Sequence, residues 1–146
     1  MSQGSRHLEV IYCDDIREEV GHKMSYMGVY SGELSVTSAP VLLAKLCIAV
    51  KVVTDISDPF TELEVRIVKG DDDLELLTTG KIPGPSDVSG FDNGSTRMMA
   101  QMAFMLAPFQ IEEETTIRVV ARTEREELRG IALRIRIAPP LPQTVQ

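Results

Sequence analysis

Residues 46–53 read Leu46-Cys47-Ile48-Ala49-Val50-Lys51-Val52-Val53, and this stretch decides the fold class. A large aliphatic residue occupies every second position from Leu46 to Val52. This period of two is the pattern of a β-strand with one buried face. We therefore expect a strand here, with its even-numbered side chains in the core.

Four further runs extend this reading into two hairpins. Residues 63–67 repeat the alternation with charges on the opposite face, and Gly70-Asp71-Asp72-Asp73 is a turn that leads into a partner strand at 74–78. Residues 116–122 and 131–137 are joined by the charged stretch 123–130, which predicts a second hairpin.

The N-terminal region predicts two strands separated by a short helical turn. Residues 8–13 are β-prone and bounded by acids. Asp15 and Glu18 have capping-box spacing and Gly21 can end a helix, so we expect one helical turn over 16–20. A second strand follows at 24–29, where Gly28 indicates a bulge or a close approach of another backbone.

The apolar run 98–106 leaves two interpretations open. Its Met, Ala and Gln residues favour a helix, but loop residues precede it and Pro108 follows, so we expect a strand. Core packing and an exposed, Met-rich partner surface are both open for its side chains.

These elements fit one all-β domain. A chain of 146 residues is about one domain long, and seven or eight short, mostly antiparallel strands predict a β-sandwich of immunoglobulin-like architecture, with a partly open barrel as the alternative. We expect a loose N-terminus at 1–6, the sandwich at 7–138 and a Pro-rich tail at 139–146. Beyond residues 46–52, the predicted core comprises Leu63, Val65, Ile67, Ile117, Val119, Leu133 and Ile135.

Net charge limits the partners. The chain has 22 acids and 15 bases, a net charge of −7, which argues against binding nucleic acid or an anionic membrane. The charge is uneven: residues 55–93 carry ten acids and three bases, whereas 115–137 carry three acids and six bases. Such asymmetry suits a polar contact or self-association, although a solvated surface explains it too.

Compartment signals point to the cytoplasm. No apolar run reaches the ~18 residues of a membrane span, and Arg6, His7 and Glu9 interrupt any signal peptide. Cys13 and Cys47 each fall within an apolar strand pattern, so we expect reduced, buried thiols.

The stretch Cys13-Asp14-Asp15-Ile16-Arg17-Glu18-Glu19-Val20-Gly21-His22-Lys23-Met24-Ser25-Tyr26-Met27-Gly28-Val29-Tyr30 resembles the start of a family of small uncharacterised bacterial proteins. Pro40, Leu46-Cys47 and Asp58-Pro59-Phe60 are similar too, so the resemblance covers about the first half of the chain. It implies a shared sandwich-like fold and no catalytic activity.

No motif predicts catalysis or a cofactor. Residues 21–25 contain Gly, Lys and Ser but lack the glycine spacing and the Gly-Lys pair of a phosphate loop. Cys13 and His22 have no third group to orient them. The two histidines and two cysteines do not have zinc-site spacing. We therefore expect a protein that is not an enzyme and holds no cofactor.

Acidic turns supply weak candidates for a metal site. Calcium takes six to eight oxygen ligands from loops, and the acidic loops 55–60, 70–73 and 86–93 can supply them if they meet at one end of the sandwich. Solvated turns are the simpler interpretation. The weak candidate ligands are Asp58, Asp71, Asp72 and Asp73.

Four arginines are the candidates for partner binding. Arg118, Arg122, Arg134 and Arg136 lie at even spacing in two neighbouring predicted strands. An Arg face can bind carboxylates or phosphates, and the alternative is cross-strand pairing with acids such as Glu64. We expect a non-enzymatic interaction or accessory module that binds a protein partner or itself, with a small-ligand or calcium-binding sandwich as the alternative.

This charge distribution gives a first prediction. Replacing Arg134 and Arg136 together by Glu should weaken any association, more at low salt than at high salt, because solvent-exposed charges are screened beyond about 8 Å at physiological salt. The thermal midpoint should change little, since exposed ion pairs contribute only ~0–1 kcal/mol. Sedimentation at two salt concentrations measures both proteins, and an unchanged assembly state in the double variant would contradict the prediction.

Overall fold

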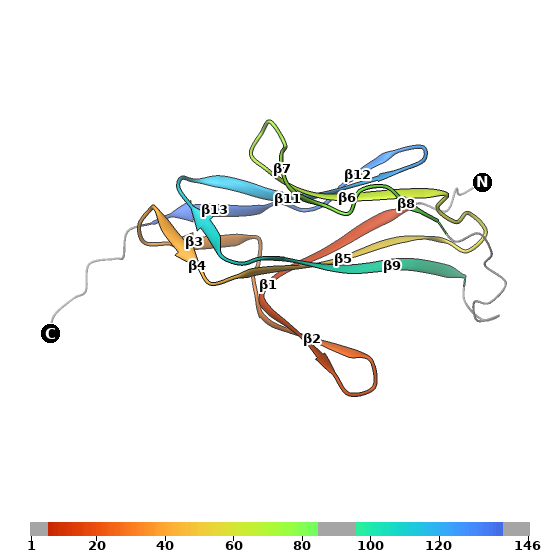
Figure 1. The fold of residues 1–146 in the computed structure, drawn as a ribbon, viewed down its shortest axis with the longest axis horizontal. Helices are drawn as coiled ribbons and strands as arrows, with labels where there is room; N and C mark the ends of the chain where they lie inside the picture. Colours follow the sequence, from red (N-terminus) through yellow and green to blue (C-terminus); the bar gives the residue numbers. More distant parts are fainter. Residues whose placement is uncertain (1–5, 85–95, 139–146) are drawn as a thin grey trace, which may run out of the picture.

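A computed structural model describes residues 6–84 and 96–138, and these residues form two β-sheets packed face to face (Figure 1). The sandwich expected from the sequence is confirmed. The described part of the chain contains thirteen strands, more than the seven or eight expected, because several are only two to four residues long. The strands are β1 (His7–Glu19), β2 (Lys23–Val29), β3 (Glu33–Val36), β4 (Val41–Leu43), β5 (Leu46–Asp55), β6 (Glu62–Lys69), β7 (Leu74–Thr78), β8 (Ile82–Pro83), β9 (Arg97–Leu106), β10 (Phe109–Ile111), β11 (Thr115–Thr123), β12 (Glu127–Arg129) and β13 (Leu133–Ile137).

Each large sheet is built around a central apolar strand. Sheet A has the order β2-β1-β5-β9, and sheet B has the order β3-β13-β11-β6-β7, with β12 added beside β11 and β8 beside β6. Strands β10 and β4 form a small separate pair. Both predicted hairpins are confirmed, since β6 pairs with β7 and β11 with β13, and β12 arises within the charged connection between the last two.

The core lies between the inner faces of the two sheets. All the core residues predicted from the alternation are buried, including those of the deciding stretch in β5. Residues 98–106 belong to strand β9, which pairs with β5 from Leu46↔Leu106 to Asp55↔Arg97. Pairing with a central strand therefore overrides the helical preference of the Met and Ala residues.

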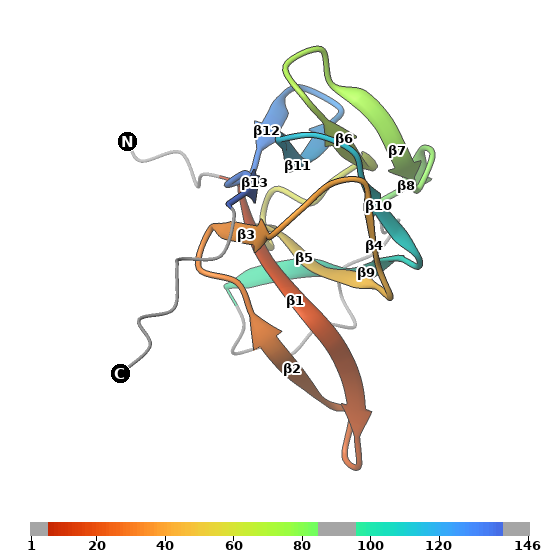
Figure 2. The same cartoon turned by 90° about the vertical axis from the view of Figure 1, so that its left-hand side faces the viewer.

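Strand β1 corrects the helical turn predicted at 16–20. It is continuous through Glu19, pairing first with β5 from His7↔Val53 to Cys13↔Cys47, and then with β2 from Cys13↔Val29 to Glu19↔Lys23. Hydrogen bonds between strands satisfy the backbone N–H and C=O groups of this segment, whereas a capping box would satisfy such groups only through neighbouring side chains. Residues 14–29 form a hairpin that projects from the sandwich, named here the arm (Figure 2).

A close approach at Gly28 shapes the base of the arm. Gly28 has φ +68, and a Cβ added there would lie 2.2 Å from Oδ2 of Asp14. The sequence predicts a bulge or a close backbone here, but the structure places the Asp14 side chain against Gly28 instead, so any side chain at this position would displace Asp14. The Asp14 carboxylate is held in place, since it accepts a hydrogen bond from the Tyr30 hydroxyl.

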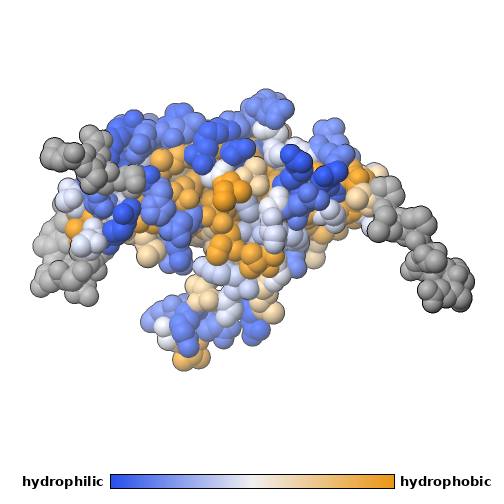
Figure 3. All heavy atoms as spheres, turned by 180° about the vertical axis from the view of Figure 1, so that it is seen from behind, coloured by the Kyte–Doolittle hydropathy of each residue, from blue (hydrophilic) through white to orange (hydrophobic). Residues whose placement is uncertain are grey.

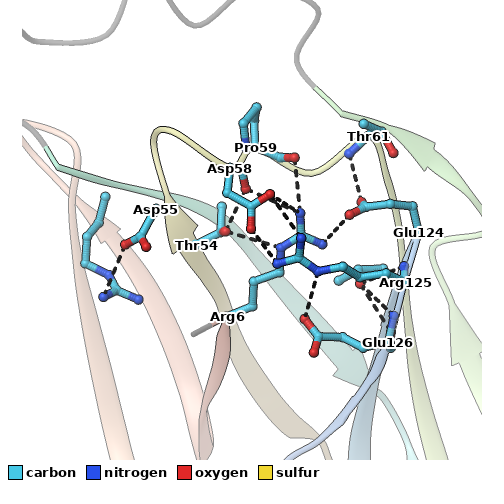
Figure 4. Close-up of polar contacts among 11 residues, drawn as sticks. Arg6, Thr54, Asp55, Asp58, Pro59, Thr61, Glu124, Arg125 and Glu126 are labelled. Carbon is cyan, nitrogen blue, oxygen red and sulfur yellow. Dashed lines mark hydrogen bonds and ion pairs between the residues drawn. The ribbon is translucent and has the colours of Figure 1, made fainter. Parts of the chain in front are cut away.

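Arg6 closes one end of the sandwich (Figure 4). We expected it in a loose N-terminus, but its side chain is buried and lies over the Phe60 ring, 4.8 Å from the centroid. Its guanidinium donates to the Glu124 carboxylate, to Oγ1 of Thr54 at 3.2 Å and to the carbonyl of Pro59 at 3.2 Å. A buried charge needs such partners, and they tie the N-terminus to two loops.

Arg6→Met should lower the free energy of unfolding by about 3 kcal/mol, because it removes one partner of a buried ion pair and leaves Glu124 uncompensated. The matched control is Arg17→Met. Arg17 is exposed and lies 3.9 Å from Glu19, so this change should cost no more than about 0.5 kcal/mol. Urea titration measures both, and equal losses would contradict the structural role of Arg6.

The same cluster makes stability depend on pH. Partial burial opposes ionisation of Glu124, but hydrogen bonds from the Thr61 amide and the Arg6 guanidinium outweigh it and lower the pKa from 4.5 to about 2. A carboxyl with a lowered folded-state pKa stabilises the fold above its unfolded-state pKa. This stabilisation is lost as pH falls from about 5 towards 2.

Glu124→Gln should therefore be less stable than the parent at neutral pH, and the difference should shrink by about 2 kcal/mol between pH 5 and pH 3. The amide cannot ionise, so it lacks the proton linkage of the carboxylate. Unfolding titrations across this range measure the difference. A gap that stays constant with pH would show that Glu124 is not the linked group.

Candidate functional site

All four candidate arginines lie on the outer face of sheet B. In β11 the inward side chains Ile117, Val119 and Ala121 belong to the core, so Arg118 and Arg122 point outward between them. In β13 the exposed Arg134 and Arg136 alternate with buried Leu133 and Ile135. The register Thr116↔Arg134 places both strands' arginines on the same face, as their spacing indicates.

Two of these arginines have carboxylate partners. Arg122 lies opposite Glu64 in register but pairs with Oε1 of Glu127 at 3.2 Å. Arg136 lies between Glu33 and Glu114, each at 3.9 Å. Cross-strand pairing with acids, the simpler interpretation, therefore accounts for Arg122 and Arg136. Their partners are acids other than Glu64.

Arg118 and Arg134 have no carboxylate partner within the described ranges 6–84 and 96–138. Arg118 donates to the carbonyl of Gly130 at 2.6 Å, and the Arg134 guanidinium makes no hydrogen bond or ion pair with a described residue. Both line a surface hollow of about 460 Å³, named here the arginine hollow. Its other lining residues are Ser31, Gly32, Glu33, Thr116, Ile131 and Ala132.

The surroundings of the hollow are polar on one side and apolar at the rim. Hydrophilic residues gather along the sheet B side of the molecule, and hydrophobic residues lie nearer its middle (Figure 3). Thr116 faces Arg134 across the strand pair, and Ile131 at the rim is 76% exposed. An acidic group that enters this hollow can contact the guanidinium groups of Arg118 and Arg134, beside the exposed side chain of Ile131.

Two of the four aspartates proposed as metal ligands are held by arginines. Asp58 accepts hydrogen bonds from Arg125, and Asp73 accepts two from Arg129, both at 2.9 Å. Hydrogen bonding to these arginines lowers the pKa of both aspartates. Asp71 and Asp72 are exposed at the tip of the β6–β7 turn.

The acidic loops also do not meet at one end of the sandwich. Loop 55–60 precedes β6 and loop 70–73 follows it, so the length of that strand separates them. No three His, Cys, Asp or Glu side chains within residues 6–84 and 96–138 are grouped to hold a metal ion. The third loop, 86–93, lies outside the described residues.

Much of the charge asymmetry in the sequence is neutralised by ion pairs within the chain. Strand β6 comes from the acidic middle, and it pairs with β11 from the basic C-terminal portion. The bridges Arg125–Asp58 and Arg129–Asp73 join the two portions. Only arginines outside such bridges are available to a partner, and sequence spacing cannot distinguish them.

The two cysteines face one another on the outer side of sheet A. Cys13 and Cys47 are register partners in β1 and β5, and both are buried, free thiols. Burial raises the pKa of each, which disfavours the reactive thiolate. His22 lies in the turn at the far end of the arm, so the structure does not bring it to Cys13.

The arm is a feature that the sequence analysis missed. Its turn presents Val20, which is 92% exposed, and Met24, Met27 and Val29 are also exposed along β2. The sequence predicts the strand at 24–29, but the capping-box spacing favours a helical turn at 16–20, so the pairing of β1 with β2 along the arm was not expected. On β9 the even-numbered side chains from Ala100 to Leu106 pack against the core, whereas Met99 and Met105 are exposed.

Comparison with protein families identifies the family of the chain. A family model described as a family of unknown function, DUF6941, matches residues 9–136. No curated protein matches the chain. The described residues contain no helix long and apolar enough to span a membrane.

Proposed function

The chain belongs to DUF6941, a family of unknown function, and from this starting point we propose that it acts by contact, as a non-enzymatic interaction module. Its arginine hollow receives an acidic segment of a protein partner. One observation carries the proposal: among the described residues, Arg118 and Arg134 lie around an open hollow and form no ion pair with a carboxylate, while neighbouring arginines on the same face are paired.

The chemistry of arginine supports a carboxylate ligand. The guanidinium presents a planar fork that matches a carboxylate, and such pairs form two parallel hydrogen bonds. Arg118 is partly fixed by its hydrogen bond to Gly130, so less conformational freedom is lost when it binds. Charges at the rim of a contact mainly set the association rate and the register of the partners.

The surrounding acids favour a short acidic segment over a polyanion. Glu33 lines the same hollow, and Asp71 and Glu114 line a neighbouring hollow of about 470 Å³ that shares Arg134. A nucleic acid or an anionic membrane would meet these carboxylates as well as the net charge of −7. A single acidic side chain reaches the arginines without contacting the acids.

A bacterial, cytoplasmic setting is part of the proposal. The two free, buried thiols fit a reducing compartment, and the N-terminal resemblance is to bacterial proteins.

Arg134→Gln should weaken binding of a short oligoglutamate peptide about threefold, because the lost charge has no intramolecular partner to compensate it. The matched control is Arg122→Gln on the same face, where Glu127 already neutralises the arginine, and binding should change little. Fluorescence anisotropy of a labelled peptide measures both. Equal affinities for the two variants, or no binding by the parent, would count against the hollow as the site.

A further inference from the structure

The two most exposed large hydrophobic side chains among the described residues lie at the tip of the arm and at the rim of the arginine hollow. Val20 is 92% exposed in the turn of the arm, and Ile131 is 76% exposed beside Arg134. Neither is covered by the part of the chain that the structure describes. Removing both from water in one contact is favourable, since burial of apolar surface drives association.

The two places also carry unlike charged side chains, although the arm tip is balanced overall, because Glu18 and Glu19 lie near Arg17 and Lys23. The arm has four acids and two bases between Asp14 and Val29. Asp14 and Asp15 are engaged at its base, where Asp15 accepts a 2.6 Å hydrogen bond from Lys45. Nearer the tip, the Glu18 carboxylate makes no hydrogen bond or ion pair with a described residue, and the Glu19 carboxylate lies 3.9 Å from Arg17.

We propose that the arm tip of one copy docks in the arginine hollow of a second copy, with Glu18 against Arg134 and Val20 against Ile131. This inference rests on the proposed function and identifies the acidic segment as residues 18–20 of the same protein. Charge complementarity and the paired exposed aliphatics support the choice of a second copy as the occupant.

The positions of the two surfaces set the symmetry of the assembly. The arm projects away from sheet B (Figure 1), whereas Arg118 and Arg134 occupy outward positions of sheet B. The proposed contact therefore joins two copies. The contact joins unlike surfaces, so it forms an open chain or a closed ring rather than a two-fold dimer.

The base of the arm is held in a defined orientation. Besides the Lys45–Asp15 bond, the Tyr30 hydroxyl donates to Asp14. Burial and this hydrogen bond raise the pKa of Tyr30 to about 12, so the hydroxyl remains a donor at neutral pH. A rigid base lowers the conformational entropy lost on docking.

A charge-swap experiment tests the contact. Glu18→Arg and Arg134→Glu alter exposed side chains without intramolecular ion pairs, so both variants should fold. Sedimentation equilibrium at low salt should show each single variant dissociating about tenfold more readily than the parent. Mixing the two variants, or combining both changes in one chain, should restore association, because each arm then meets a hollow of opposite charge.

Glu113→Arg is the matched control for the change in net charge, since Glu113 is an exposed acid outside the arm with no described contact, and it should associate like the parent. Val20→Asp should also weaken association, because it replaces the side chain that contacts Ile131. The charge-swap variants should not restore this association. A parent that stays monomeric, or single variants that associate like the parent, or a mixture no better than its components would overturn the inference. Peptide binding in the hollow by such a monomeric parent would retain the proposed function while the arm contact failed.

Discussion

Backbone hydrogen bonding along β1 is satisfied by two different strands, and the switch between them at Cys13 sets where the arm leaves the sandwich. Residues before Cys13 pair with β5, and residues after it pair with β2. Because unpaired backbone groups are costly away from water, the strand needs both partners to remain extended. The contacts of Asp14 with Tyr30 and of Asp15 with Lys45 lie at this junction and fix the direction of the arm.

Charged residues have three different roles in this small domain. Arg6 is buried and ties the N-terminus to the loops that contain Asp58 and Glu124. Arg125 and Arg129 neutralise aspartates of the acidic middle. Arg118 and Arg134 remain without carboxylates around an open hollow. The function by contact that we propose rests on this third group, which differs from the others only in its three-dimensional neighbours.

A function by contact fits the two exposed surfaces of the fold. The arm offers apolar and acidic side chains at a projecting turn, and the hollow offers basic ones on a flat sheet. The proposed contact between the arm and the hollow joins unlike surfaces, so the assembly that we propose is head-to-tail. The buried thiols of Cys13 and Cys47 lie beneath the base of the arm, and burial raises the pKa of both, which suits a packing role.

The sequence by itself determined the fold class, the β6–β7 and β11–β13 hairpins and the buried residues, because alternation with a period of two reports directly which face of a strand is buried. The even spacing of the four arginines along two strands also predicted that they share one face. Tertiary structure alone decided that residues 16–19 extend a strand, that Arg6 is buried, and which arginines lack an acidic partner. These outcomes depend on groups far apart in sequence, such as Arg6 with Glu124 or β1 with β2, and local spacing carries no information about which distant group arrives to satisfy a charge or a backbone hydrogen bond.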